Sequence, residues 1–163
     1  MLQNFVHLFS YFSPEVATFL MAMTPVGELR LAIPVGILAY KLPIWKVFIL
    51  SIIGNSIPPL VILLLAGKFH AWVHKKSGFL SAKWIKALDR AQEKFSSDYK
   101  KYGLIGLMIF IGIPIPWTGA YTGALAAFVF GIPLKSAWSY FLAGISIAAT
   151  ITTLITVGTG KIF

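Results

Sequence analysis

The apolar positions of this chain form four long regions, and two of these regions contain no charge and no break in their pattern. Residues 47–67 and residues 137–157 are each runs of 21 uncharged residues, bounded by lysines. At about 1.5 Å of rise per residue, a helix of that length crosses a hydrocarbon core of about 30 Å. The two runs therefore predict two transmembrane helices.

The other two apolar regions are interrupted in the middle by turn-forming residues. Residues 16–40 form two apolar arms around the sequence TPVGELR, and residues 104–132 form two arms around PIPWTGAYTG. Arms of eight to ten residues reach only about 12 to 15 Å as helix, half of the bilayer core. We interpret each region as a re-entrant helical hairpin. The alternative is one kinked spanning helix in each place, because membrane helices tolerate Pro and Gly.

An amphipathic stretch precedes each broken region. In residues 81–102, bulky apolar side chains recur at helical spacing with basic residues between them, which is typical of a helix lying in a membrane interface. The alternative is a solvated helix that packs on the protein's own loops. Near the start of the chain, Phe5, Leu8, Phe9 and Phe12 repeat the spacing without the charge.

These pieces occur twice in the same order, as an interfacial helix, a broken hairpin and a full span. A nearly constant offset of 90 or 91 residues relates Pro43 to Pro133, Gly54 to Gly144, Ser56 to Ser146 and Pro25 to Pro116. The predicted fold is an all-α membrane protein in one domain, residues 1–163, with repeat one at 1–68 and repeat two at 81–161. Because each half then crosses the bilayer once, the second half is expected to be inverted relative to the first.

Composition and charge agree with a bilayer environment. The chain has 163 residues, of which 58% are apolar and 12% charged, and its mean hydropathy is +0.82. The net charge is +9, but nine of the fourteen basic residues fall within residues 68–101. That clustering predicts a cytoplasmic loop joining the two repeats rather than nucleic-acid binding. We expect a multi-pass protein of the cytoplasmic membrane.

Glu28 and Arg30 are the only charged residues in either broken region. Placing each at membrane depth costs about 2.5 kcal/mol or more, so something must compensate them. The functional interpretation is a polar centre in which Arg30 holds an anionic group while Glu28 exchanges a proton or binds a cation. The alternatives are a structural pair that pins the loop, and snorkelling to an interface.

The turn residues add backbone and side-chain groups to this centre. Prolines and glycines free backbone amides and carbonyls from helical bonding, and Thr122 with its aromatic and hydroxyl neighbours offers donors; packing between hairpins is the alternative role. Asn55 could contact the site, although bonding to an adjacent helix is favoured. The predicted substrate- or ion-binding residues are Glu28, Arg30, Pro25, Gly27, Pro34, Asn55, Pro114, Pro116, Trp117, Thr118 and Tyr121, with Gly119 and Gly123 as further turn residues.

Signals for enzymatic chemistry are missing from the sequence. The chain has no cysteine, which excludes disulfides and thiolate catalysis, and it contains no G-x-S-x-G, H-E-x-x-H or P-loop pattern. His70 and His74 have no carboxylate nearby in sequence, so no metal site is expected. We expect neither an enzyme nor a cofactor.

Two motifs resemble the signature segments of the family of putative small multidrug export proteins. They are PVGELRLAIPVGI at residues 25–37 and GIPIPWTGAYTGALAA at residues 112–127, and the resemblance covers nearly the whole chain. That family is regarded as a distant branch of the DedA-like (SNARE-associated, VTT) superfamily, which the resemblance associates with paired re-entrant hairpins and lipid or polyprenyl-phosphate translocation. By position, Glu28 and Arg30 match the acidic and basic residues of the first segment. Residues 112–132 depart from the DedA-like pattern because they carry no arginine.

Two functions from different classes fit these features. The favoured one is a membrane transporter or translocase for a small amphipathic, lipid-linked or drug-like substrate, proton-coupled through Glu28. Because one copy has few helices to enclose a path, a homo-oligomer is expected, with membrane lipids as further partners. The alternative is a membrane scaffold or assembly factor that binds lipid or protein without transport.

The hairpin interpretation predicts that both termini lie outside the cell when residues 68–101 are cytoplasmic, because re-entrant segments do not change sides. Cysteines introduced at residues 2 and 162 should react with an impermeant reagent added to intact cells. Termini protected in intact cells would favour four full spans and reject the hairpins.

Overall fold

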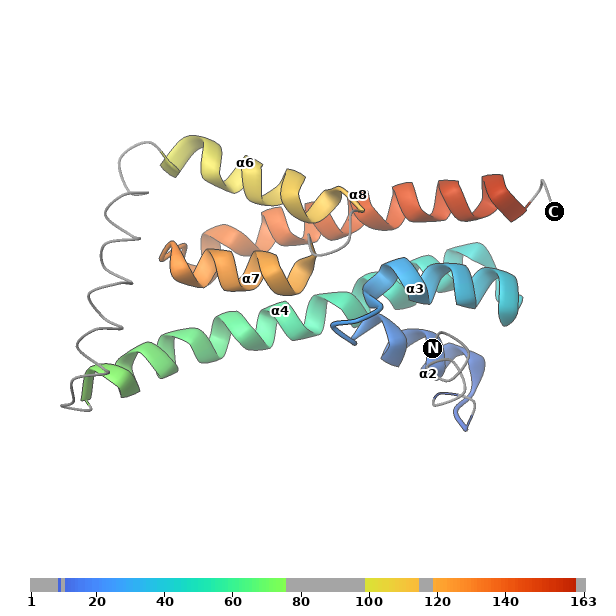
Figure 1. The fold of residues 1–163 in the computed structure, drawn as a ribbon, viewed down its shortest axis with the longest axis horizontal. Coiled ribbons are helices and arrows are strands. Elements are labelled where there is room, and N and C mark those ends of the chain that lie inside the picture. Colours follow the sequence, from blue (N-terminus) through green and yellow to red (C-terminus); the bar gives the residue numbers. More distant parts are fainter. Residues whose placement is uncertain (1–8, 10, 76–98, 115–118, 161–163) are drawn as a thin grey trace.

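A computed structural model describes residues 9, 11–75, 99–114 and 119–160. Within these residues the structure is all-helical, with six α-helices, one π-helix and no strand (Figure 1), which confirms the predicted class. The elements in chain order are α2 (Pro14–Ala22), α3 (Glu28–Pro34), the π-helix η1 (Val35–Ala39), α4 (Ile44–Lys75), α6 (Tyr99–Gly112), α7 (Ala120–Val129) and α8 (Leu134–Gly160). The predicted amphipathic helix at 81–102 lies outside the described residues up to position 98, and so does most of the aromatic stretch at 5–12.

Helices α4 and α8 are the two long elements, and they run antiparallel along the molecule (Figure 1). Their segments Ile44–Leu65 and Leu134–Thr159 are long and apolar enough to cross a membrane, as predicted. Pro58 and Pro59 lie inside α4, yet the helix continues through them to Lys75. Packing of both faces of α4 against other helices explains this tolerance, since neighbouring helices stabilise a helix at its prolines.

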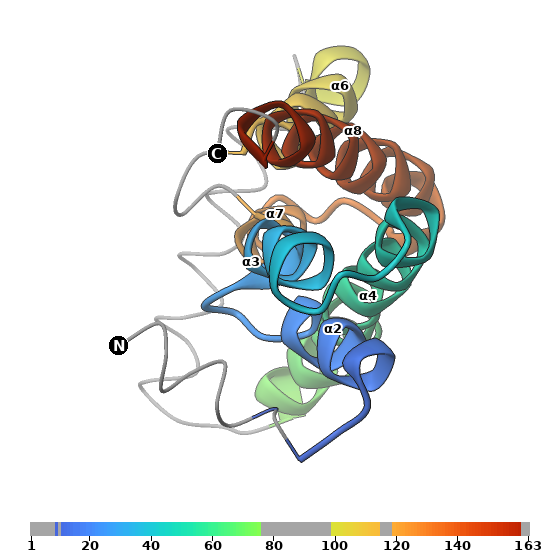
Figure 2. The same cartoon turned by 90° about the vertical axis from the view of Figure 1, so that its right-hand side faces the viewer.

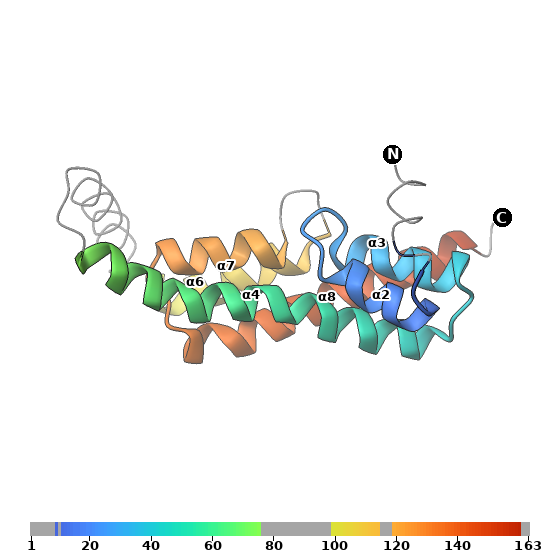
Figure 3. The ribbon, with the colours of Figure 1, turned by 90° about the horizontal axis from the view of Figure 1, so that it is seen from below.

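Each broken region forms two helices that pack on each other, α2 with α3 and α6 with α7. The first hairpin is open toward the end where α4 begins and α8 ends, and the second is open toward the opposite end (Figures 1 and 3). The turn between α2 and α3 therefore lies beside the facing ends of α6 and α7, near the middle of the long axis. The two breaks in the sequence meet in space.

The helix bounds correct three sequence-based expectations. Glu28 and Arg30 belong to the first turn of α3 rather than to the loop before it. Helix α7 begins at Ala120, inside the predicted turn. Helix α6 begins at Tyr99. The last residues of the predicted amphipathic helix, from position 99, are therefore continuous with the first arm of the second hairpin. For α7 the reason lies far along the chain, because the Glu28 carboxylate lies against its first turn.

Pro34 marks a change of helix type in the first hairpin. It lies inside the helix that begins at Glu28, and the five residues after it form the π-helix η1, in which the Tyr40 N–H bonds to the Val35 carbonyl at 2.9 Å. Proline has no N–H to continue the α-helical ladder, and wider turns form where that ladder is interrupted. Lys41 then adopts a left-handed conformation (φ 51°), which ends the hairpin before α4.

Small residues let each hairpin approach its own long helix closely. A Cβ added at Gly54 would lie 2.5 Å from the Phe19 carbonyl of α2, and a Cβ added at Gly144 would lie 2.8 Å from the Met108 carbonyl of α6. Gly54 and Gly144 are one of the pairs separated by 90 residues, and the two carbonyls are 89 residues apart. The repeated glycine thus has the same packing role in both halves, as expected for membrane helices that associate through small residues.

The second arm of each hairpin packs on the long helix of the other half. Helix α3 contacts α8, and α7 contacts α4. The end-on view shows α3 and α7 between α8 and α4 (Figure 2). The largest buried apolar cluster joins all of these elements, and alanines contribute much of it: Ala120, Ala124, Ala127, Ala137, Ala148 and Ala149. The two halves therefore share one core rather than forming two separate units.

One ion pair ties the start of α2 to the start of α4. The Lys46 ammonium donates to the Glu15 carboxylate at 2.7 Å, with both side chains about one third exposed. This hydrogen bond lowers the pKa of Glu15 below its ordinary value. Glu15 and Glu28 are the two acidic residues among the described positions, which makes Glu15 a useful control carboxylate.

The glycine contacts generate a stability prediction. Gly54→Ala places a methyl group against a backbone carbonyl that cannot move without shifting α2, so we expect it to destabilise the protein in detergent by about 1–3 kcal/mol. Gly158→Ala is the matched control, because nothing lies within 4 Å of a Cβ at that position. Helix propensity alone would make both changes neutral or stabilising. Equal unfolding midpoints for the two variants would contradict the close approach.

Candidate functional site

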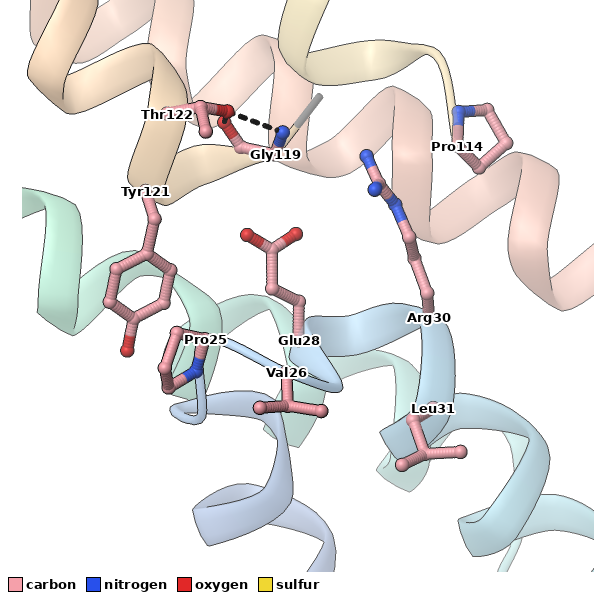
Figure 4. Close-up of a pocket in the computed structure, with 9 residues that line it drawn as sticks. All are labelled: Pro25, Val26, Glu28, Arg30, Leu31, Pro114, Gly119, Tyr121 and Thr122. Atoms are coloured by element: carbon pink, nitrogen blue, oxygen red, sulfur yellow. Dashed lines mark hydrogen bonds between the residues drawn. The ribbon is translucent and has the colours of Figure 1, made fainter. Parts of the chain in front are cut away.

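A cavity of about 730 Å³ lies where the two hairpin turns meet (Figure 4). Its lining is shared between the hairpins and combines charged, hydroxyl and apolar groups. The lining residues are Pro25, Val26, Glu28, Arg30, Leu31, Pro114, Gly119, Tyr121 and Thr122. Glu28 and Arg30 both point from α3 toward the second hairpin (Figure 4).

The Glu28 carboxylate binds the N-terminus of α7. Glu28 is only 7% exposed, and its carboxylate faces the first turn of that helix, where the backbone N–H groups of Ala120 and Tyr121 interact favourably with its charge. The first N–H groups of any helix lack partners within the helix, and the helix dipole adds a partial positive charge there. Glu28 thus supplies from one hairpin the cap that the other hairpin lacks.

Gly119 makes this contact possible. It is the N-cap residue of α7, and a Cβ at this position would overlap both oxygens of the Glu28 carboxylate. Its backbone is extended, so the requirement for glycine comes from space rather than from conformation. The Gly119 N–H donates to the Thr122 hydroxyl at 2.9 Å, so a side chain from within α7 satisfies the remaining donor.

Glu28 itself has an unusual backbone. Its φ is 47°, in the left-handed region that residues other than glycine, asparagine and aspartate rarely adopt. Such a conformation costs about 1–3 kcal/mol and persists only where surrounding contacts hold it. The carboxylate packs against Gly119 at the start of α7, and the Glu28 N–H donates to the Thr24 carbonyl at 3.0 Å. Strain at a buried charged residue in a cavity is a feature typical of functional sites.

Two further side chains cross between the hairpins. The Tyr121 hydroxyl donates to the carbonyl of Met23, the residue that follows α2. Arg30 Nη2 donates to the carbonyl of Ile113, the residue that follows α6, at 3.1 Å. These two donor side chains reach the C-terminal ends of α2 and α6, whereas the Glu28 carboxylate reaches the N-terminal end of α7. Helix dipoles favour this arrangement of donors and acceptors. We call the bonds made by Glu28, Tyr121 and Arg30 the inter-hairpin clamp.

The structure brings together part of the predicted site. Pro25, Glu28, Arg30, Pro114 and Tyr121 line the cavity, as do the turn residues Gly119 and Thr122. Three other predicted members are not among the residues that line the cavity: Gly27, Pro34 and Asn55. The remaining three lie outside the described residues: Pro116, Trp117 and Thr118.

Gly27 sits within the first turn, where its N–H reaches the Thr24 hydroxyl at 3.4 Å. Asn55 is 1% exposed inside α4, so it is buried in the helix packing rather than among the residues that line the cavity.

Sequence reasoning missed two apolar lining residues, Val26 and Leu31. Leu31 follows Glu28 by three positions, so the two share one face of α3, and this helical spacing was the available signal. Val26 is 83% exposed at the tip of the turn. Across the described part of the chain, no group of three His, Cys, Asp or Glu residues is placed to hold a metal ion.

A comparison with protein families gives one match. The model of a family described as "Putative small multi-drug export protein" matches residues 28–151, which is more than two thirds of the chain. The chain belongs to this family. No curated protein and no solved structure gave a match.

The matched region of this small multi-drug export family protein contains the site almost entirely. It begins at Glu28 and includes α3, the apolar segment Ile44–Leu65, the second hairpin and the second apolar segment as far as residue 151. The family and the two apolar helices together indicate a membrane protein. The more distant relation to DedA-like proteins stays a prediction.

The contact between Gly119 and Glu28 can be tested by a double-mutant cycle. Gly119→Ala should destabilise the protein by about 1–3 kcal/mol, because the new methyl group displaces the carboxylate from α7. In Glu28→Ala the carboxylate is gone, so adding Gly119→Ala should cost less than it does alone. Unfolding free energies in detergent give the coupling. Strictly additive effects would show that the two residues do not touch.

Proposed function

We propose that this protein is a transporter or translocase that moves a small amphipathic, lipid-linked or drug-like substrate across the cytoplasmic membrane. The observation that carries the proposal is the cavity between the hairpin turns. It holds Glu28 and Arg30, the two charged residues of the broken regions, in a chain that is otherwise strongly apolar. Ionisable residues at membrane depth most often mark a substrate or ion path. Burying them costs free energy, so they are expected where they serve a function.

Our proposed topology is an inverted repeat with two re-entrant hairpins. Four observations support it. The arms of each hairpin pack side by side, and α2 and α7 have only 9 and 10 residues, about half of a span. The hairpins open toward opposite ends (Figure 3), and the repeated glycines Gly54 and Gly144 make matching contacts. In such a fold both hairpin turns lie near the bilayer midplane.

The proposed role of Glu28 is to couple transport to a proton. A carboxylate is an acceptor when ionised and a donor when protonated, so its contacts change with its protonation state. Arg30 then acts as the fixed positive charge on the same wall of the cavity. A guanidinium can hold a carboxylate or phosphate through two parallel bonds, which gives it a role in substrate binding that a lysine would fill poorly.

The cavity walls suit an amphipathic substrate. Pro25, Val26, Leu31 and Pro114 form apolar surface beside the charged pair. An apolar tail can contact these residues while a polar group reaches Arg30 or Thr122. One copy has few helices around the cavity, so we propose that a homo-oligomer encloses the path.

The proposal predicts that Glu28→Gln abolishes pH-driven flux, because glutamine keeps the shape and removes the exchangeable charge. Arg30→Lys should keep partial flux. The measurement is uptake of ethidium and, separately, flipping of a fluorescent phospholipid in proteoliposomes under an imposed pH gradient. The two probes distinguish a drug-like substrate from a lipid-like one.

Glu15→Gln is the matched control, since Glu15 is the other described carboxylate and bonds to Lys46 away from the cavity. It should transport as the wild type does. Full flux by Glu28→Gln would reject the proton role, and aggregation of that variant alone would favour a structural role for Glu28. Absence of flux of both probes in the wild type would favour the scaffold alternative.

A further inference from the structure

Glu28 is the member of the inter-hairpin clamp whose charge can be switched by a proton. Of the other two members, a tyrosine hydroxyl and an arginine guanidinium ordinarily titrate at pH 10 or above, far from physiological pH. Arg30 from α3 and the phenol of Tyr121 from α7 are the charged or titratable side chains that interact electrostatically with Glu28 among the described residues. The clamp therefore has one pH-responsive member and two constant ones.

We infer that the protonation state of Glu28 opens and closes the contact between the two hairpin turns. This inference deepens the proposed function, on which it rests, by assigning the conformational step that the proton controls. Ionised Glu28 holds the first turn of α7 against α3, and protonated Glu28 releases it. No step of this inference requires the substrate to be present.

The position of the carboxylate at the N-terminus of α7 explains the direction of the switch. Bonds from backbone N–H groups to an ionised carboxylate are about twice as strong as bonds between neutral groups. The charge also interacts favourably with the N-terminal dipole of α7. Protonation removes the charge, so both contributions to the closed state fall. The closed state is therefore favoured at high pH and loses population as the pH decreases.

The backbone of Glu28 adds a restoring force. Its left-handed conformation, with φ at 47°, is maintained against an unfavourable torsional energy. Once the carboxylate no longer holds α7, this residue can return to an ordinary helical or extended conformation. The change would move the start of α3 relative to the second hairpin. Strain in the closed state thus favours release once the charge of the carboxylate is lost.

The close contact between Glu28 and Gly119 means that the closed state requires a residue without a side chain at position 119. The carboxylate occupies the volume that a side chain at position 119 would need. Glycine therefore lets Glu28 bind the helix end directly, and no residue of α7 can replace it as a side-chain cap at that position. When Glu28 leaves, the two N–H groups of Ala120 and Tyr121 face the cavity and are open to water or substrate.

The inference can be tested by distance measurement between the hairpins. The chain has no cysteine, so spin labels at Val26→Cys and Leu125→Cys report only on those two sites. Val26 is 83% exposed at the first turn and Leu125 is 53% exposed on α7, so both tolerate a label. Distance distributions are recorded by double electron–electron resonance in lipid nanodiscs between pH 8 and pH 5, without substrate.

We expect one short distance at pH 8 and a second, longer distance that grows as the pH falls. In the Glu28→Gln background the ratio of long to short distance at pH 8 should rise about tenfold, and its pH dependence should disappear. Glu15→Gln should retain the wild-type profile. Tyr121→Phe removes a constant bond of the clamp, so it should raise the long population at every pH while keeping the pH dependence.

Distances in the doubly labelled protein with Glu28 unchanged that do not vary with pH would overturn the inference, and this result needs no substitution at Glu28. A Glu28→Gln profile equal to the wild type would overturn it as well. The outcome is separable from that of the flux experiment. A pH-dependent distance without flux of either probe would retain the switch and reject transport. Coupled flux without any distance change would retain transport and reject the switch.

Discussion

A buried carboxylate needs fixed donors around it, and in this protein the first turn of α7 supplies them to Glu28. The donor groups belong to one hairpin and the carboxylate to the other. Each hairpin therefore stabilises an end of a helix that it does not contain, and Tyr121 and Arg30 repeat this relation at two helix C-termini. The cavity exists because the helix ends are held together by these bonds rather than by apolar packing alone.

Close helix packing provides the frame for these bonds. Glycines at positions 54 and 144 let the first arm of each hairpin lie directly on its own long helix, while the second arms cross to the other half. A membrane offers little hydrophobic driving force between helices, so close contact and polar bonds must account for much of the stability. The protein concentrates its polar bonds at the turns and its close contacts along the arms. The turns are consequently the place where a change in charge has the largest structural effect.

This division has a consequence for transport. If the long helices are fixed by many small contacts, the hairpin turns are the parts that a single proton can move. The site then combines a binding cavity and a conformational control in the same few residues, which is economical for a chain with two long apolar helices. A transporter with a larger helix bundle could place these functions in separate regions.

The sequence by itself determined which segments are helical and where they break. Runs of 21 uncharged residues and arms interrupted by Pro and Gly are local patterns, so the two long helices, the two pairs of short helices and the position of Glu28 and Arg30 at the first break could be predicted from them. Only the tertiary structure decided what these residues contact. Gly119 and Glu28 are 91 positions apart, and the sequence holds no local signal that one needs space for the other. Asn55 illustrates the same limit. A single amide in an apolar run gives the same sequence pattern whether its side chain faces the cavity or another helix. Local propensity sets helices, but which helix end meets which side chain depends on packing between segments that are distant in the chain.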